Sequence, residues 1–164
     1  MKAHFEMMAA YNAWANERLY AAAAELSDEA YRRDCGAFFK SMHGTLNHLF
    51  VTDVIWMSRF RGKANPPWKL DHIAHDNFTE LKARRKAMDR EIQGWVHSLS
   101  SSELAGPFSY VTVLDGSKQN QPLREALAHF FNHQTHHRGQ CHAMLTRLGV
   151  DAPPLDLLFF QREG

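Results

Sequence analysis

The sequence has no long hydrophobic run and nothing that resembles a secretory leader. None of its stretches approaches the roughly 20 consecutive apolar residues that a bilayer-spanning helix needs. The first twenty residues, MKAHFEMMAAYNAWANERLY, contain Glu6, Asn12, Asn16 and Glu17, whereas the core of a signal peptide is uninterruptedly apolar. We therefore expect neither a membrane span nor a signal peptide.

The chain also has few cysteines and almost no net charge. The two cysteines, Cys35 and Cys141, form no Cys-x-x-Cys pair, so we expect a reducing compartment, most simply the cytoplasm. The 19 basic and 18 acidic residues leave a net charge of +1, which provides no basic surface for nucleic acid. With 164 residues, 45% of them hydrophobic, the chain is predicted to form one domain, residues 1–164, with a sizeable core.

Apolar residues recur in steps of three and four along four long stretches, which predicts four helices. The predicted helices cover residues 5–26, 39–60, 77–99 and 122–148. An alternating segment around Asp115-Gly116 predicts a tight hairpin before the last helix, and Ser27 can cap a short extra turn. The apolar tail APPLDLLFFQ is expected to pack across the other helices. Together these elements predict an all-α fold, a four-helix bundle with one short hairpin.

Five of the eleven histidines lie in HFFNHQTHHRGQCH, inside the last predicted helix. At 100° per residue, His137 falls on the core-facing line of that helix, and His133 falls on its shoulder one turn earlier. The remaining three turn toward the polar side or the opposite flank and are expected at the surface or as residues that support the ligands: His129, His136 and His142. Two imidazoles four residues apart can share one metal ion. The alternative, a polar helix face with one satisfied core histidine, stays open at this point.

A third ligand is expected from another helix. His48 lies at the edge of the apolar stripe of the second predicted helix, while His43 projects from the other side and is expected to be a core-satisfied residue. No glutamate follows His133, and Glu-x-x-His pairs are missing, so zinc-protease and di-iron sites are excluded. Three neutral imidazoles suit a catalytic divalent metal with open positions; zinc and nickel are expected first, and iron and manganese fit as well.

Several other polar residues lie in or beside the predicted apolar seams. Asp53 either supports a histidine N–H or binds the metal directly, or it has a tyrosine or backbone partner inside the core. Asn12 is expected to fix the register of the helices. Arg85 and Asp89 belong to an alternating charged run that is predicted to be a solvated helix face. Cys141 is a fourth soft ligand or, more simply, a small core hydrophobe.

The whole chain resembles the DinB family, also called the DinB/YfiT-like group. The matching segments are YNAWANERLY, TLNHLFVTDVIW, HFFNHQTHHRGQ leading into LTRLG, and the ending APPLDLLFF. The most specific is the family pattern of a histidine, three residues and His-Arg-Gly-Gln, here from His133 to Gln140. The resemblance implies a four-helix bundle with up-down-down-up connectivity and a homodimer. It also implies a divalent metal held by His48, His133 and His137.

Known chemistry in relatives of this kind joins a low-molecular-weight thiol to an electrophile, or isomerises maleylpyruvate with mycothiol. The resemblance therefore implies a metal-dependent thiol S-transferase that acts on a small molecule. Arg138 would meet an acidic group of the cosubstrate or form a helix-surface salt bridge. Met8, Trp14, Trp56 and Tyr110 either form the rim of the site or, as residues at helical spacing more often do, belong to the core. The alternatives are a metal or small-ligand sensor without turnover, and a metal-free histidine face that responds to pH. The sequence alone assigns no catalytic residue.

Overall fold

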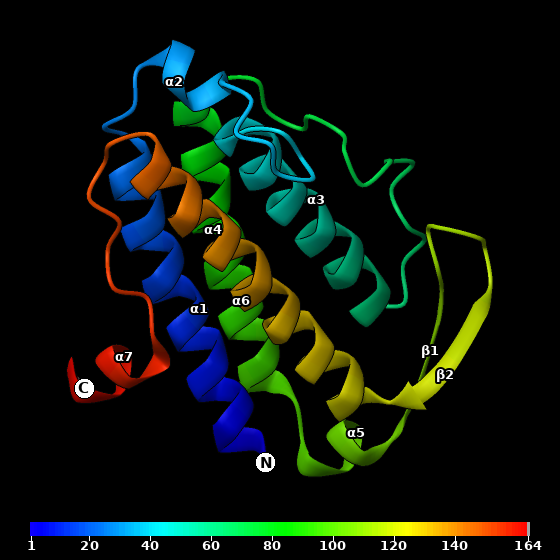
Figure 1. The fold of residues 1–164 in the computed structure, drawn as a ribbon. Coiled ribbons are helices and arrows are strands. Elements are labelled where there is room, and N and C mark those ends of the chain that lie inside the picture. Colours follow the sequence, from blue (N-terminus) through cyan, green and yellow to red (C-terminus); the bar gives the residue numbers. More distant parts are fainter. Residues whose placement is uncertain (164) are drawn as a thin grey trace.

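The computed structural model describes residues 1–163, and four long helices dominate it. These helices are α1 (Lys2–Ala23), α3 (Met42–Phe60), α4 (Phe78–Ser98) and α6 (Leu123–Arg147). In Figure 1, α1 and α6 run upward while α3 and α4 run downward, which is the expected up-down-down-up order. Because α1 packs against α4 and α6, and α3 packs against the same two helices, the four enclose a common core.

The parallel direction of α3 and α4 forces a long connection between them. Residues 61–77 run back along the outside of α3 before α4 begins (Figure 1). Gly62, with a φ of 65°, ends α3 as the sequence predicted. Asn77 caps α4 by accepting a hydrogen bond from the backbone N–H of Glu80 at 3.0 Å. The connection carries Leu70 past the face of α3 that holds His48.

The helix α3 begins three residues later than the apolar pattern predicts. Residues 35–40 fold into a turn instead, in which Lys40 has a φ of 67° and the Cys35 N–H donates to its carbonyl at 2.7 Å. Ser41 then caps the helix, since its side chain accepts from the Gly44 N–H at 3.1 Å. The short turn predicted after the first helix is observed as α2 (Asp28–Arg32), and its Ser27 cap is confirmed.

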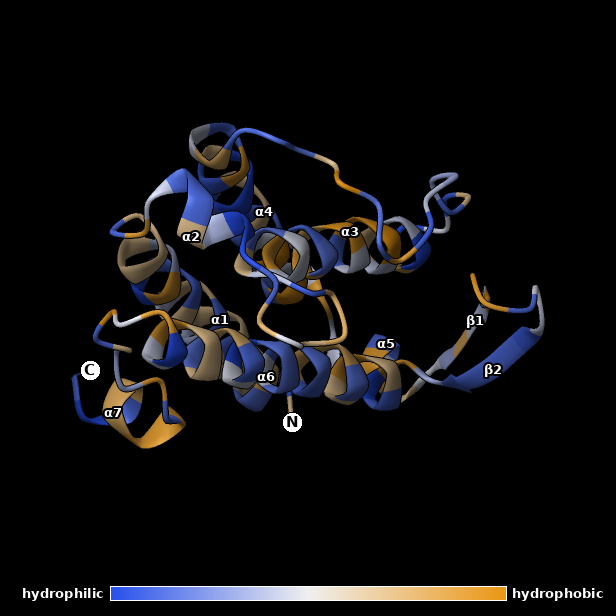
Figure 2. Cartoon of the chain, turned by 45° about the horizontal axis from the view of Figure 1, so that its top comes forward, coloured by the Kyte–Doolittle hydropathy of each residue, from blue (hydrophilic) through white to orange (hydrophobic). Residues whose placement is uncertain are grey.

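The segment before α6 contains a short helix and the predicted hairpin. The helix, α5 (Ser101–Ala105), was not predicted because it spans little more than one turn, although it carries a complete capping box. Strands β1 (Pro107–Val111) and β2 (Lys118–Pro122) pair antiparallel, with Gly116 in the turn at a φ of 70°. Figure 2 shows that β2 is hydrophilic and that the hairpin projects from the end of the helices. The fold is therefore mostly helical with one two-stranded sheet rather than strictly all-α.

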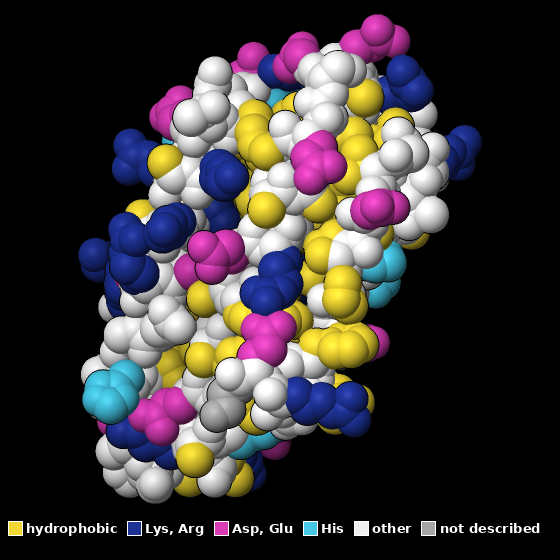
Figure 3. All heavy atoms as spheres, turned by 90° about the vertical axis from the view of Figure 1, so that its left-hand side faces the viewer, with side chains coloured by type: hydrophobic (Ala, Val, Ile, Leu, Met, Phe, Trp, Pro, Cys, Tyr) yellow, Lys and Arg dark blue, Asp and Glu magenta, His cyan; other side chains and the backbone are white. Residues whose placement is uncertain are grey.

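The C-terminal tail packs against α1, as its composition predicted. Its helix α7 (Leu157–Glu163) follows Leu155, whose carbonyl accepts a hydrogen bond from the Tyr11 hydroxyl at 2.6 Å. The Trp14 indole donates to the Glu163 carboxylate at 2.7 Å. Figure 3 shows the side of the molecule where α1 and α7 lie, with charged side chains of both signs and hydrophobic side chains between them. Within residues 1–163 no helix is both long and apolar enough to cross a bilayer.

One prediction about α4 is wrong. Arg85 and Asp89, assigned to a solvated face, are 2% and 6% exposed and form an ion pair with an N–O distance of 2.8 Å. They point between α1 and α3 because α4 turns this charged pair inward beside the apolar seam of Leu81, Met88 and Ile92. A run of charged residues is normally solvent-exposed, so its sequence predicts an exposed face. A buried charge needs partners, and here those partners lie on other helices, which the sequence of one helix does not show.

Candidate metal centre

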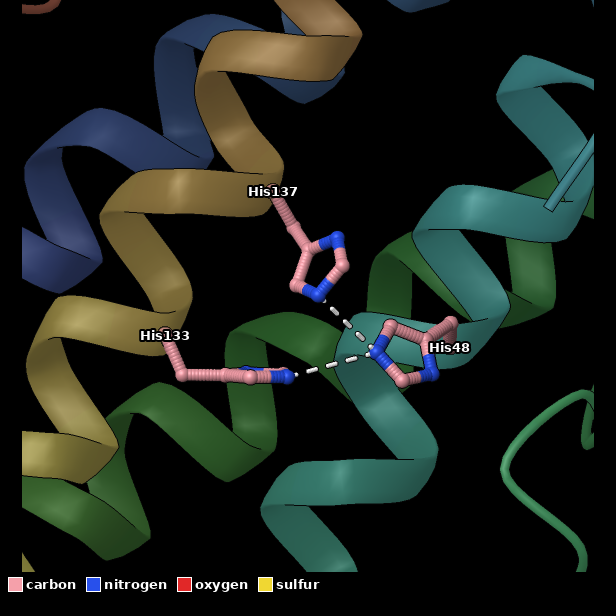
Figure 4. Close-up of side chains that lie close together, drawn as sticks. All are labelled: His48, His133 and His137. Atoms are coloured by element: carbon pink, nitrogen blue, oxygen red, sulfur yellow. Dashed lines mark hydrogen bonds between the residues drawn. The ribbon is translucent and has the colours of Figure 1, made fainter. Parts of the chain in front are cut away.

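Three imidazoles from two helices converge inside the bundle. His48 projects from α3, and His133 and His137 project from successive turns of α6 (Figure 4). The Nε2 atom of His48 lies 3.3 Å from Nε2 of His133 and 3.2 Å from Nε2 of His137. One ligand atom from each residue lies within 4.8 Å of the other two. The structure thus brings together the three histidines that the sequence analysis selected.

The outer nitrogens of two of these rings are bound by acceptors. Nδ1 of His48 lies 2.8 Å from the Leu70 carbonyl, and Nδ1 of His137 lies 2.8 Å from Oε1 of Gln140. A carbonyl oxygen can only accept, so each Nδ1 carries the proton and each Nε2 keeps its lone pair. The lone pairs of His48 and His137 therefore face one another at hydrogen-bond distance without a proton between them. A cation at the point of convergence removes this repulsion.

The environment keeps the three rings uncharged at neutral pH. Burial lowers the pKa of His48 to about 4, against a smaller opposing effect of the hydrogen bond to the Leu70 carbonyl. Burial, reinforced by the neighbouring histidines, lowers the pKa of His133 to about 3. Burial also lowers the pKa of His137, although the bond to Gln140 opposes the shift. Neutral imidazole is the form that binds metal ions, so the cluster is ready to act as a ligand set.

The separations fit coordination of one ion. A zinc ion about 2.0–2.1 Å from two imidazole nitrogens, at the tetrahedral angle, holds those nitrogens about 3.3 Å apart. The two Nε2 separations from His48, 3.3 Å to His133 and 3.2 Å to His137, agree with this value. Three protein ligands leave at least one coordination position for water or substrate, as in catalytic zinc sites. The donor set alone does not distinguish zinc from nickel, iron or manganese.

A cleft of about 310 Å³ opens beside the three histidines. His48 and His133 line it together with Trp56 and Arg59 of α3 and Tyr110 of β1. Its volume is at the lower end of the range of small-molecule sites. A larger hollow of about 610 Å³ adjoins it but contains none of the three histidines, so we place the candidate site in the smaller cleft.

The turn before α3 covers the other side of His48. The Phe39 ring stacks on the His48 ring with centroids 3.8 Å apart and meets the His137 ring edge-on at 5.7 Å. Phe39 can approach this closely because Gly44 has no side chain: a Cβ atom there would overlap the Phe39 carbonyl oxygen. Phe39 was not predicted as a site residue because the sequence pattern assigned it to a helix.

Asp53 has a different partner from those that the sequence suggested. Its carboxylate is fully buried and forms an ion pair with Arg85 of α4, with an N–O distance of 2.5 Å. It also accepts a hydrogen bond from the side-chain amide of Gln134, which lies on α6 between His133 and His137. Burial raises the pKa of Asp53 to about 6, against the opposing charge of Arg85. Asp53 is therefore neither a ligand nor a partner of a tyrosine, and it links α3, α4 and α6.

Arg138 is buried instead of meeting solvent or a cosubstrate. Only 2% of it is exposed, and its guanidinium donates to the side-chain oxygen of Asn12. Asn12 in turn donates to Asp89 at 3.3 Å, and Asn16 donates to the same carboxylate at 2.9 Å. The role expected of Asn12, a polar contact between helices, agrees with this geometry. The prediction for Arg138 is wrong, because its side chain points inward to Asn12 of α1, a partner that the sequence of α6 does not reveal.

The remaining candidates divide clearly. Cys141 is completely buried and lies outside the histidine cluster, so it packs as a small core residue. His129 is exposed, as expected, and it also lines the cleft, where it lies against Trp56 with ring centroids 5.3 Å apart. Trp56 and Tyr110 line the cleft as predicted, whereas Trp14 bonds to the C-terminal helix on another side of the molecule.

His43 and His136 lie close to the cluster along the chain but do not join it. His43 is buried beside Arg32 and Asp76, with its Nε2 atom 3.4 Å from the Arg32 guanidinium. His136 is exposed and contacts the side-chain nitrogen of Gln140 at 3.1 Å. The helical angles therefore separated the inward rings of α6 from the outward ones.

Comparison with known proteins identifies the family of this chain. The sequence model of the DinB family matches residues 1–163. A curated relative, Protein DinB of Bacillus subtilis (strain 168), is 29% identical over 162 residues, which cover 89% of this chain and 87% of the relative. The family-model match includes the helices that contribute the histidine cluster and the tail.

Two solved structures have the same fold. YfiT from Bacillus subtilis, described as a probable metal-dependent hydrolase with an unusual four-helix bundle topology, matches with a TM-score of 0.71 and 13% identity over 91% of this chain and 90% of its own. A DinB-like protein from Bacillus cereus ATCC 10987 matches with a TM-score of 0.65 and 16% identity, over 85% of this chain and 89% of its own. With the family model matching residues 1–163, this chain belongs to the DinB family.

Proposed function

We propose that this protein is a divalent-metal-dependent enzyme that activates a nucleophile for attack on a small molecule in the cleft. His48, His133 and His137 are the proposed ligands, through their Nε2 atoms. The observation that carries the proposal is the convergence of three neutral imidazoles, two with fixed outer protons, at the side of a cleft. The likeness to YfiT, itself described as a probable metal-dependent hydrolase, supports a metal-dependent reaction.

The protein residues have defined tasks in this proposal. The Leu70 carbonyl and the Gln140 side chain hold the protons on Nδ1 and so orient two of the ligands. Phe39 shields one face of His48 from water, while Trp56 and Tyr110 offer aromatic surface to the substrate. A bound divalent ion supplies a Lewis acid that lowers the pKa of a thiol or water. We expect zinc or nickel first; iron and manganese suit the same ligands.

The proposed reaction is S-transfer from a low-molecular-weight thiol to an electrophile. The thiol loses its proton to solvent, its sulfur forms a C–S bond with the electrophilic carbon, and the leaving group departs with the bonding electron pair. This version follows from the family resemblance. Hydrolysis, with water in place of the thiol, is the second candidate because of the likeness to YfiT.

The test compares thiols and water as nucleophiles. Protein loaded in turn with zinc, nickel, iron or manganese is assayed for conjugation of a fluorescent bimane electrophile with a panel of small thiols, and for cleavage of nitrophenyl esters. We expect turnover that His137→Ala abolishes and that His142→Ala, a change on the same helix outside the cluster, leaves intact. Turnover no higher than that of His137→Ala with every metal and thiol would reject S-transfer. Ester cleavage alone would favour the hydrolase.

A protein that binds metal or a small ligand without turnover is the alternative. It predicts metal uptake and ligand-linked changes in stability with no catalysis by any metal and thiol. The cleft beside the histidines favours the enzyme, since a sensing or structural site is more often closed by packed side chains. A homodimer, a cytoplasmic location and a single domain over residues 1–164 are further parts of the proposal.

A further inference from the structure

The cleft contains a positive charge that the proposed chemistry does not use. Arg59 lies on α3, eleven residues after His48, and lines the same cleft. At 1.5 Å per residue, the two Cα atoms are roughly 16 Å apart along the helix. Thr52, Ile55 and Trp56 lie between them on the face of α3 that lines the cleft. The histidine cluster and the guanidinium therefore belong to one elongated cavity.

The guanidinium of Arg59 has no acidic partner among residues 1–163. No carboxylate oxygen of the described chain lies within 4.0 Å of it, whereas Arg61, two residues further on, is paired with Glu91. The single hydrogen bond from the Arg59 side chain runs from Nε to Oδ1 of Asn65 at 3.0 Å. Its two terminal nitrogens, Nη1 and Nη2, make no hydrogen bond to the described residues. A half-buried arginine is thus held in place while its outer edge stays free.

Aromatic rings fix the orientation of this cation. The guanidinium carbon lies 4.7 Å from the centroid of the Trp56 ring and 4.9 Å from that of Tyr110. Burial lowers the pKa of Arg59 below its ordinary value, yet an arginine remains charged at neutral pH. The free Nη1 and Nη2 edge presents parallel N–H donors, which match the two oxygens of a carboxylate. One positive charge among apolar walls suits a monoanion better than a phosphate, because a phosphate usually requires several donors.

We propose that Arg59 is a specificity residue that binds the carboxylate of a small, partly apolar acid. The apolar part of that acid lies on Ile55, Trp56 and Leu114, and its other end points toward His48 and His133. The direction in which the reactive end points rests on the proposed function. The preference for an acid rests only on the charge and contacts of Arg59.

The test measures binding rather than turnover. Dissociation constants of 3-phenylpropionate and of its neutral amide are determined by NMR titration for metal-free and zinc-loaded protein. We expect the acid to bind at least tenfold more tightly than the amide, and this preference to disappear in Arg59→Gln. Arg59→Lys should keep part of it, since the charge remains and the planar donor edge is lost. Arg61→Gln is the matched control and should retain the full preference.

The possible outcomes separate this proposal from the metal proposal. An acid preference that survives in Arg59→Gln would show that the carboxylate binds elsewhere. So would a preference that appears only in zinc-loaded protein. Inorganic phosphate binding as tightly as the acid would contradict a monoanion site. A preference that depends on Arg59 in protein that takes up no metal would support this inference while the proposed function fails.

Conjugation assays then identify which reactant carries the acid. The first pair compares 3-mercaptopropionate with 2-mercaptoethanol, using a neutral electrophile. The second compares iodoacetate with iodoacetamide, using a neutral thiol. The KM of the acidic member should rise at least tenfold in Arg59→Gln in only one of the two pairs. An equal change in KM for acidic and neutral members of both pairs would contradict the assignment.

Discussion

The proposed ligands depend on neighbouring residues that would not themselves contact the metal. Gln140 holds the Nδ1 proton of His137, and its side-chain nitrogen contacts His136 at the surface. Such outer partners orient a ligand and raise its basicity, and their loss typically weakens metal binding 10–100-fold, as an order of magnitude. The family pattern includes Gln140 directly after the arginine and glycine, but the pattern alone does not predict its hydrogen bond to His137.

The first prediction concerns this glutamine. Gln140→Ala should weaken zinc binding roughly 10–100-fold, because the His137 ring loses the acceptor that fixes its tautomer. Gln140→Glu should bind zinc at least as tightly as the wild type, since a carboxylate is a stronger acceptor. Competition with a chromophoric chelator measures both affinities, and His136→Ala serves as the control. Equal affinities in Gln140→Ala and the wild type would show that the contact has no part in the site.

The second prediction concerns the pH dependence of Cys141. Burial raises the pKa of its thiol to about 12, so at pH 8.5 the folded protein contains roughly 1,000-fold less thiolate at this position than an unperturbed cysteine would. Because the folded-state pKa is raised, this thiol stabilises the fold fully below about pH 9, and that contribution is lost as pH rises through 12. In a Cys35→Ala background, iodoacetamide should label Cys141 only when urea unfolds the chain. Rapid labelling of native protein at pH 8.5 would contradict its burial.

The third prediction concerns the buried ion pair between α3 and α4. Asp53→Ala leaves the Arg85 charge without one of its two carboxylates and should lower the free energy of unfolding by about 3–5 kcal/mol. Glu29→Ala removes the exposed pair with Arg33 and should cost about 1 kcal/mol or less. Urea denaturation compares the two variants. A similar small cost for both would mean that Asp53 and Arg85 do not interact as the structure shows.

Among single residues, sequence reasoning succeeded where one helix contained the information. The inward direction of His133 and His137 could be predicted from the angles of α6, and that of His48 from its place beside an apolar stripe. Asp53 and Arg138 could not be assigned, because their partners lie 32 and 126 positions away in the sequence. A buried charge needs a partner that neutralises it, and the periodicity of one helix does not show which distant residue that partner is.

Individual elements show where local rules were overridden by packing. The apolar pattern of residues 39–60 predicts a helix from its first residue, yet the structure uses residues 35–40 as a turn that covers His48. The long connection at residues 61–77 has little pattern of its own, but it supplies the Leu70 carbonyl to the same ring. The turn contributes the Phe39 ring and the connection contributes the Leu70 carbonyl, and both are placed by loop conformations that composition and periodicity do not predict.

The fourth prediction tests the turn before α3. In Gly44→Ala the new methyl group overlaps the Phe39 carbonyl, so the turn must move and the unfolding free energy should fall by about 1–3 kcal/mol. Metal affinity should fall too, because Phe39 stacks on His48. Gly94→Ala, at an open position of α4, should instead stabilise the protein by about 0.5–1 kcal/mol through helix propensity. Unchanged stability and affinity in Gly44→Ala would refute the close approach.

At the scale of the whole molecule, the bundle places charge in its core and neutral imidazoles at the cleft. Two buried carboxylates balance the charge of two buried guanidinium groups, and this set joins α1, α3, α4 and α6. Its members are Asp53, Asp89, Arg85 and Arg138. This set lies beside the histidine cluster, since Gln134, which lies between His133 and His137 on α6, donates a hydrogen bond to Asp53. The helix order and the hairpin followed from sequence pattern and family resemblance. The cleft did not, because residues from α3, α6, β1 and the 61–77 connection meet there only after folding.

The central claim is that three histidines hold one metal ion. Elemental analysis of protein purified without an affinity tag measures the metal content per chain directly, with folding of each variant checked by circular dichroism. We predict close to one equivalent of a single divalent metal in the wild type and in His142→Ala. The content should fall below about one tenth of an equivalent in His48→Ala, His133→Ala and His137→Ala, because removal of one of three ligands lowers the affinity by orders of magnitude. A full equivalent retained in folded forms of these three variants, or a metal-free wild type that takes up none of the four candidate metals, would contradict the account.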